Sequence, residues 1–154
     1  MNRDPRLLVP DSPEIATAFE VMQFAFAGME GRIDPPSSLK QMTAETLAEM
    51  ACTSEVWVIG TPVVATVVLT PKPAVLYVGK LAVQDQRMGL GRVLMELAEN
   101  RAIELGKDWL ELESRVELVE VHEVFKALGF HEVMRTTHAG YGRPTGIVFR
   151  KKVV

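Results

Sequence analysis

A short stretch of glycine and basic residues between an expected strand and an expected helix is best suited to chemistry in this sequence. Residues 81–92 read Leu-Ala-Val-Gln-Asp-Gln-Arg-Met-Gly-Leu-Gly-Arg. Main-chain N–H groups in the first turn of a helix have no internal partners, and the helix dipole gives them partial positive charge. Gly89 and Gly91 have no side chain that would keep an anion away. Arg87 and Arg92 add charge, so the segment predicts a site for a phosphate or diphosphate.

Two common phosphate-binding patterns do not fit this segment. A dinucleotide-binding fingerprint needs a third glycine three residues after Gly91, and that position is Leu94. A P-loop ending at Gly79–Lys80 needs a glycine where the sequence has Ala74. The sequence therefore indicates neither a dinucleotide-binding fold nor a P-loop nucleotide-binding site.

A third pattern fits. Gln86, Gly89 and Gly91 form a Gln/Arg-x-x-Gly-x-Gly/Ala signature, and with it the sequence resembles the GCN5-related N-acetyltransferase (GNAT) superfamily. The later segment 125–130, Phe-Lys-Ala-Leu-Gly-Phe, resembles the superfamily's aromatic-x-x-Leu-Gly-Phe helix end. The spacing of the two motifs and the order of expected elements also match, over nearly the whole chain.

The resemblance implies acetyl-CoA as the donor. The acceptor would be a primary amine of a small molecule, peptide or protein, which attacks the thioester directly in a ternary complex. The strand over residues 75–83 would carry a bulge, for which Gly79 is a candidate, and would leave main-chain groups free for pantetheine and for the thioester carbonyl. The donor-binding residues expected on this basis are Leu81, Ala82, Val83, Gln86, Arg87, Met88, Gly89, Leu90, Gly91, Arg92 and Phe125.

The sequence departs from the superfamily where protons are usually transferred. Many members have a tyrosine acid at the position of Phe125, and several have a glutamate base on the strand that here spans residues 75–83 without an acid. Three other residues are candidates for catalysis. Tyr141 could be the acid or could pack its loop, Glu113 could act through water or face solvent, and His122 could react or cap a helix.

Two further functions follow from these departures. The missing tyrosine and the acid-free strand are also typical of a non-catalytic module that binds or senses an acyl-CoA. A transferase that uses a longer acyl-CoA is the third alternative. Release of free thiol across a panel of amines distinguishes the transferases from the sensor.

The elements that must position these residues predict one mixed α/β layered domain over residues 1–154. It has a GNAT-like, mostly antiparallel sheet of about six to seven strands, with about four helices beside it. Runs rich in β-branched residues predict strands, and apolar residues at helical spacing predict helices. The expected strands are 6–9, 56–59, 63–69, 75–83, 109–113, 130–136 and 147–151, and the expected helices are 11–28, 43–51, 89–105 and 118–128.

Composition excludes several other classes of function. The net charge is −3 with a pI near 5.7, and no basic stripe indicates a nucleic-acid partner. Cys52 is the only cysteine, so neither an internal disulfide nor a cysteine-rich metal site is expected, and the three histidines lack metal-ligand spacing. The longest apolar run, 63–69, is far shorter than the roughly 20 residues that cross a bilayer. We therefore expect a cytoplasmic protein without a metal or a membrane partner, and homodimerisation is left open.

Overall fold

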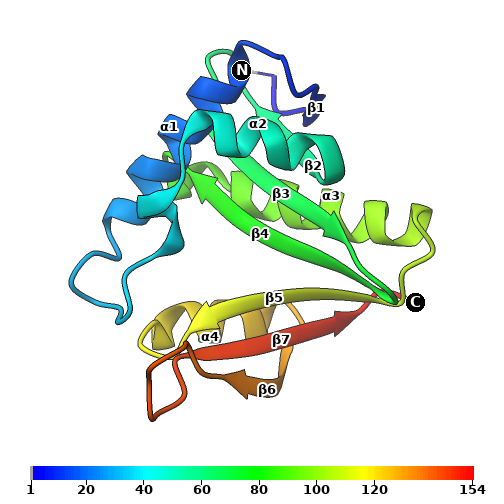
Figure 1. The fold of residues 1–154 in the computed structure, drawn as a ribbon. Coiled ribbons are helices and arrows are strands. Elements are labelled where there is room, and N and C mark those ends of the chain that lie inside the picture. The colour runs from blue at the N-terminus through cyan, green and yellow to red at the C-terminus, as the bar shows by residue number, and fades with distance from the viewer. Residues whose placement is uncertain (1) are drawn as a thin grey trace.

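The strands form one sheet in the order β1-β2-β3-β4-β5-β7-β6 in the computed structural model, which describes residues 2–154 (Figure 1). Neighbouring strands are antiparallel except for β4 and β5, which are parallel. The strands are β1 (Arg6–Leu8), β2 (Glu55–Ile59), β3 (Ala65–Pro71), β4 (Val75–Val83), β5 (Trp109–Arg115), β6 (His131–Thr136) and β7 (Gly146–Lys152). The helices are α1 (Glu14–Ala27), α2 (Ala44–Thr53), α3 (Leu90–Glu104) and α4 (Val119–Ala127), with short 3₁₀ turns η1 (Ser38–Gln41) and η2 (Gln86–Met88). The predicted fold class is confirmed.

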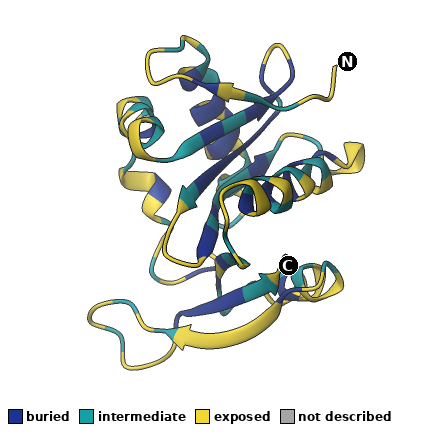
Figure 2. Ribbon diagram, turned by 90° about the vertical axis from the view of Figure 1, so that its right-hand side faces the viewer, coloured by how far each residue is buried: buried dark blue, intermediate teal, exposed yellow. Residues whose placement is uncertain are grey.

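Helices cover the two faces of the sheet unequally. Leu76 and Val78 of β4 pack into the core beneath α3. Strict alternation would place Ala82 on the same face, but an extra residue in β4 reverses it, and Ala82 packs into a second core beneath α1 and α2. The half of the sheet made by β5, β7 and β6 packs on α4 through Phe149. Residues along β6 are nearly all exposed, whereas the first part of β7 is buried (Figure 2). No helix within residues 2–154 has the length and apolar character needed to span a membrane.

The strand predicted over residues 63–69 begins two residues late. Val63 and Val64 lie in the turn that returns the chain from β2, where the Val64 amide donates to the Ile59 carbonyl at 2.9 Å. Val63 is nevertheless buried, because its side chain packs into the core beneath α1 and α2. The apolar run thus reflects burial more than strand geometry at its first two positions.

The strands β4 and β5 pair only where they begin. Three residue pairs join them, the last being Tyr77 with Glu111, and Figure 1 shows the two strands spreading apart beyond that point. The register of β4 against β3 shifts in the same region, where Lys80 and Leu81 lie between the pairs Val68–Gly79 and Thr66–Ala82. This extra residue is a β-bulge, which bends a strand and increases its twist. We call the open wedge between β4 and β5 the fork.

The bulge lies beside Gly79 rather than on it. Lys80 has the left-handed backbone, with φ of 52°, whereas Gly79 does not. The glycine instead makes room for Tyr77, because a Cβ at this position would lie 3.2 Å from the Tyr77 ring. The sequence-based expectation of a bulge is therefore correct for this stretch of β4 but off by one residue.

Candidate active site

One arm of the fork presents unpaired main-chain groups. Beyond Tyr77, the edge of β4 that faces β5 has no strand partner within residues 2–154. Unpaired N–H and C=O groups on a strand edge bind extended chains that carry amide groups. Leu81, Ala82 and Val83 lie on this free stretch, and it leads directly to the turn that begins α3.

The first turn of α3 is open to an anion. Gly89 is its N-cap, with φ of 70°, and no side chain caps the helix. Leu90 is 1% exposed as a whole residue and anchors this turn in the core beneath α3. A Cβ built on Gly91 would meet no atom within 4 Å, so the space in front of this turn is free. Without a capping side chain, main-chain N–H groups of the first turn stay unpaired at the positive end of a fifteen-residue helix, beside the open space at Gly91.

Three arginines lie around this turn. Arg87 is paired with Asp85 at 3.0 Å, and its side chain is 90% exposed. Arg92 lines a cavity of about 290 Å³ between α3 and the end of α4. Arg3 donates from Nη2 to the Met88 carbonyl at 2.6 Å, although the two residues are 85 positions apart. Sequence reasoning missed Arg3, because nothing near the N-terminus indicates that it reaches this turn.

The predicted donor-binding residues therefore follow one path, with one exception. Residues 81–83 and 86–92 run continuously along the free β4 edge, through η2 and into α3. Phe125 lies apart on α4, where its ring centroid is 6.1 Å from that of Phe130 and 5.8 Å from that of Phe149. Its ring is part of an aromatic cluster beneath α4, and it carries no proton to transfer.

Glu113 lies on the other arm of the fork, two residues beyond the last β4–β5 pair. Its side chain is exposed on the face of β5 opposite the core residue Leu112, and its Oε1 accepts a hydrogen bond from the Thr136 hydroxyl. A Cβ on Gly146 of β7 would lie 2.5 Å from both of these oxygens, so the glycine makes room for this pair. The neighbouring Glu111 instead forms an ion pair with Arg150, at 2.9 Å.

Tyr77 stands at the base of the fork. Its ring packs over Gly79 and beneath the Lys72 ammonium, 4.3 Å from the ring centroid. Burial, with the nearby negative charges of Glu113 and Glu111, raises the pKa of Tyr77 to about 12. The hydroxyl therefore keeps its proton at neutral pH. Sequence reasoning looked for an acid on this strand and did not consider the tyrosine.

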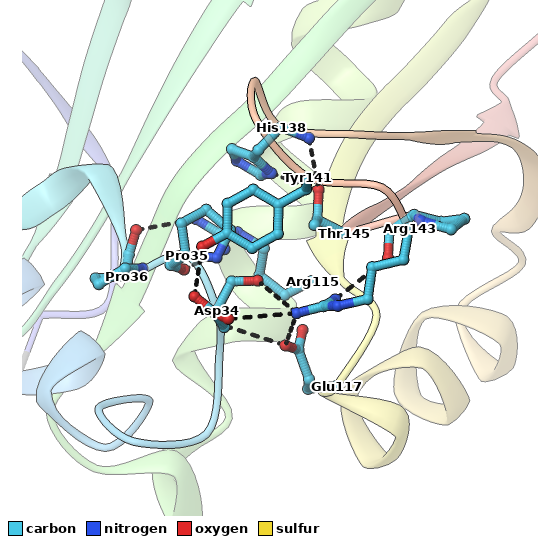
Figure 3. A network of polar contacts seen from close by, with 10 residues as sticks. Asp34, Pro35, Pro36, Arg115, Glu117, His138, Tyr141, Arg143 and Thr145 are labelled. Atoms are coloured by element: carbon cyan, nitrogen blue, oxygen red, sulfur yellow. Dashed lines mark hydrogen bonds and ion pairs between the residues drawn. The ribbon is translucent and has the colours of Figure 1, made fainter.

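Tyr141 belongs to a network that ties two loops together (Figure 3). Its hydroxyl donates to Asp34, and this bond raises the pKa of Tyr141. Arg143 lies 3.5 Å from Asp34 Oδ2 and 4.0 Å from Glu117 Oε2, and Glu117 also accepts the Asp34 main-chain N–H at 3.0 Å. We call these four side chains the loop clasp. It joins the α1–η1 loop to the β6–β7 loop at the mouth of the fork.

His122 lies on the opposite side of the sheet from Glu113 and Tyr141. Its side chain is buried, its Nε2 is 2.9 Å from the Arg115 carbonyl, and its ring packs on Phe149 with centroids 5.4 Å apart. These contacts tie α4 to the end of β5. In residues 2–154, no three or more His, Cys, Asp or Glu side chains gather in a way that could hold a metal ion.

Solved structures of acetyltransferases share this architecture. A structure assigned to the GNAT family, from Desulfovibrio desulfuricans, superposes with a TM-score of 0.76 at 18% identity, covering 98% of this chain and 99% of that one. The ribosomal-protein-S18-alanine N-acetyltransferase of Escherichia coli superposes with a TM-score of 0.70 at 20% identity, covering 97% and 94%. The aminoglycoside 6'-acetyltransferase type Ii gives 0.74 at 16% identity, covering 98% and 97%. No protein-family model and no curated protein sequence matches the chain.

These likenesses define the class of fold. The chain has the GNAT fold over nearly its whole length, as the resemblance in the sequence predicted. Identities of 20% or less carry no substrate from those proteins to this one.

We expect substitution at the two glycines of the α3 turn to have different effects. Gly91→Val should fold normally, because its Cβ enters free space, but it should weaken CoA binding by at least tenfold because that space lies before the helix N–H groups. Gly89→Val should destabilise the protein by about 1–2 kcal/mol, since a β-branched residue is strained at positive φ. Calorimetric titration with CoA and thermal unfolding separate the two effects. Unchanged CoA affinity in a folded Gly91→Val protein would contradict the assignment of this turn.

Removal of the Arg3 charge should weaken CoA binding about fivefold at low salt, since an exposed charge contact contributes about 1 kcal/mol. The difference between Arg3→Gln and the unmodified protein should shrink as ionic strength rises. Lys126→Gln, on the exposed side of α4, is the control. Equal affinities of Arg3→Gln and Lys126→Gln at low salt would exclude Arg3 from the site.

Proposed function

We propose that this chain is an N-acetyltransferase that moves an acetyl group from acetyl-CoA to a primary amine. The observation that carries the proposal is the continuous path from the unpaired β4 edge to the uncapped start of α3. Pantetheine contains two amide groups that can pair with a strand edge, and the diphosphate suits the free N–H groups of a helix start. The path accommodates both parts of CoA in the order in which the molecule carries them.

Acetyl-CoA supplies an acyl group that is already activated as a thioester. Main-chain N–H groups on the free stretch of β4, near Leu81 and Ala82, would polarise its carbonyl. The amine nitrogen forms a bond to the carbonyl carbon, the carbon–sulfur bond breaks, and sulfur leaves as thiolate and takes a proton. The nitrogen gives up its surplus protons, so the protein must both accept and return a proton.

Glu113 is the proposed proton acceptor, acting through water. It lies on β5 beyond the last β4–β5 pair, and its exposed carboxylate rests over Gly146 of β7 against Thr136, so water must connect it to the amine. We assign no proton transfer to His122, because its side chain is buried on the other side of the sheet. Tyr141 is the proposed proton donor to the thiolate, and its hydroxyl must first leave Asp34, so the loop clasp must open during turnover.

The first test is turnover. Acetyl-CoA is incubated with the protein and a panel of small amines, amino acids and peptide N-termini, and free thiol is measured together with the mass of the product. We expect thiol release that depends on the amine and that needs at least tenfold more acetyl-CoA in Gly91→Val. Binding of CoA without turnover of any amine would favour the acyl-CoA-binding module over the enzyme. A preference for longer acyl-CoA donors in the same assay would favour the third alternative.

Glu113→Gln should lower kcat about 100-fold with unchanged CoA affinity, because a general base contributes two to four orders of magnitude. Glu132→Gln, an exposed residue of β6 that pairs with Arg135, is the matched control and should keep its activity. Activity of Glu113→Gln that equals the control would remove Glu113 from the mechanism.

Tyr141→Phe should lower kcat, because the proposed proton donor is lost. Asp34→Asn keeps the tyrosine hydroxyl but takes away the carboxylate that holds it, so this variant should retain turnover. Both are compared in steady-state assays at saturating acetyl-CoA. Undiminished kcat in Tyr141→Phe would show that another group protonates the thiolate.

A further inference from the structure

Two cationic side chains, one from each arm of the fork, converge on the same short segment. Lys80 on the β4 bulge donates from Nζ to Ser38 Oγ at 3.1 Å. Arg115 at the end of β5 donates to the carbonyl oxygens of Pro35 and Pro36, at 3.2 Å for the second. The two basic groups thus meet at residues 35–38, across the mouth of the fork.

Neither cation is neutralised by a carboxylate. Within residues 2–154, Lys80 and Arg115 form no ion pair. Their polar contacts are a hydroxyl and main-chain carbonyls, and the Lys80 ammonium also lies 6.0 Å from the ring centroid of Phe26. The nearby acids have other partners, since Asp34 and Glu117 lie against Arg143, and Glu113 accepts from Thr136. Burial, and to a lesser extent the positive charge of Arg115, lowers the pKa of Lys80. Two half-buried cations that repel each other are suited to an anion brought by a ligand.

The backbone conformation at Lys80 also indicates a functional role for its side chain. Its φ is 52°, a left-handed conformation that glycine adopts at lower cost. Gly79 immediately precedes it, yet the strained position carries the long basic side chain. Strained backbone is concentrated at functional sites, where the side chain has a role that outweighs its cost.

The position of Glu113 relative to Arg115 indicates how a ligand with both charges would be oriented. Glu113 and Arg115 are two residues apart on β5 and share one face, so their Cα atoms lie about 7 Å apart along the strand. An ammonium near Glu113 and an anion near Arg115 would then be only a few bonds apart in one small molecule. This face of β5 therefore carries a negative charge at Glu113 and a positive charge at Arg115.

We propose that the acceptor is a small amine that carries a carboxylate, as an amino acid does, with the amine toward Glu113 and the carboxylate between Lys80 and Arg115. This inference rests on the proposed acetyl transfer and narrows its acceptor. The chemical step is unchanged: nitrogen bonds to the acetyl carbon, CoA leaves as the thiol, and the carboxylate takes no part.

The test compares amino acids with their carboxamides. Each pair differs only in the negative charge, and the carboxamide has the more easily deprotonated amine, so intrinsic reactivity alone favours the carboxamide. We expect kcat/KM to be at least about tenfold higher for the best amino acid than for its carboxamide, mainly through KM, because the carboxylate makes hydrogen bonds to charged groups. Lys80→Gln and Arg115→Gln should each reduce this preference, and Lys80→Arg should largely retain it. Lys126→Gln, on α4, is the control that should leave it unchanged.

The outcomes separate this inference from the proposed function. Equal kcat/KM for both members of every pair, or a preference that survives in both Lys80→Gln and Arg115→Gln, would overturn the carboxylate site and leave the acetyltransferase intact.

If no amine is acetylated, the same pairs are titrated calorimetrically in the presence of CoA. Binding of an amino acid that is lost for its carboxamide and for Lys80→Gln would then support the site without the reaction. No difference in binding would overturn it. Thermal unfolding of each variant shows whether it is folded. If Lys80→Gln does not fold, Arg115→Gln takes its place in the test.

Discussion

The short contact between β4 and β5 is the constraint on which the candidate active site depends. Parallel strands normally stay paired along their length, whereas these two separate after three residue pairs. The extra residue in β4 bends the strand just beyond Tyr77, and β5 continues straight along β7. A full ladder would have used the main-chain groups that the proposal gives to pantetheine. It would also have closed the wedge between the stretch of β4 that carries Lys80 and the stretch of β5 that carries Glu113 and Arg115.

The helix turn and the strand order could be predicted from the sequence because their signals are local. The Gln-x-x-Gly-x-Gly turn needs only neighbouring residues, and the β-branched runs specify strands wherever they pack. Arg3 at Met88 and Tyr141 at Asp34 could not be predicted, since 85 and 107 residues separate the partners. The contacts of Lys80 depend in addition on a bulge one residue from the glycine that suggested it.

The loop clasp shows how the two ends of the chain share one site. The α1–η1 loop comes from the N-terminal half and the β6–β7 loop from the C-terminal end, and Glu117 lies between them (Figure 3). The Glu117 Oε1 atom is buried without a hydrogen-bond partner, which costs free energy while the clasp is closed. Glu117 therefore holds the clasp through Oε2 alone, while Oε1 opposes its closure.

Recognition through the peptide backbone has a consequence for the divergence of such proteins. The proposed donor path uses amide groups, which every residue except proline possesses, and its strictest demand is the absence of a side chain at Gly89 and Gly91. Most positions along the path can therefore change during evolution while the shape of the binding groove persists. The structural neighbours, at 14–20% identity over nearly the full chain, show that this fold persists while most side chains change.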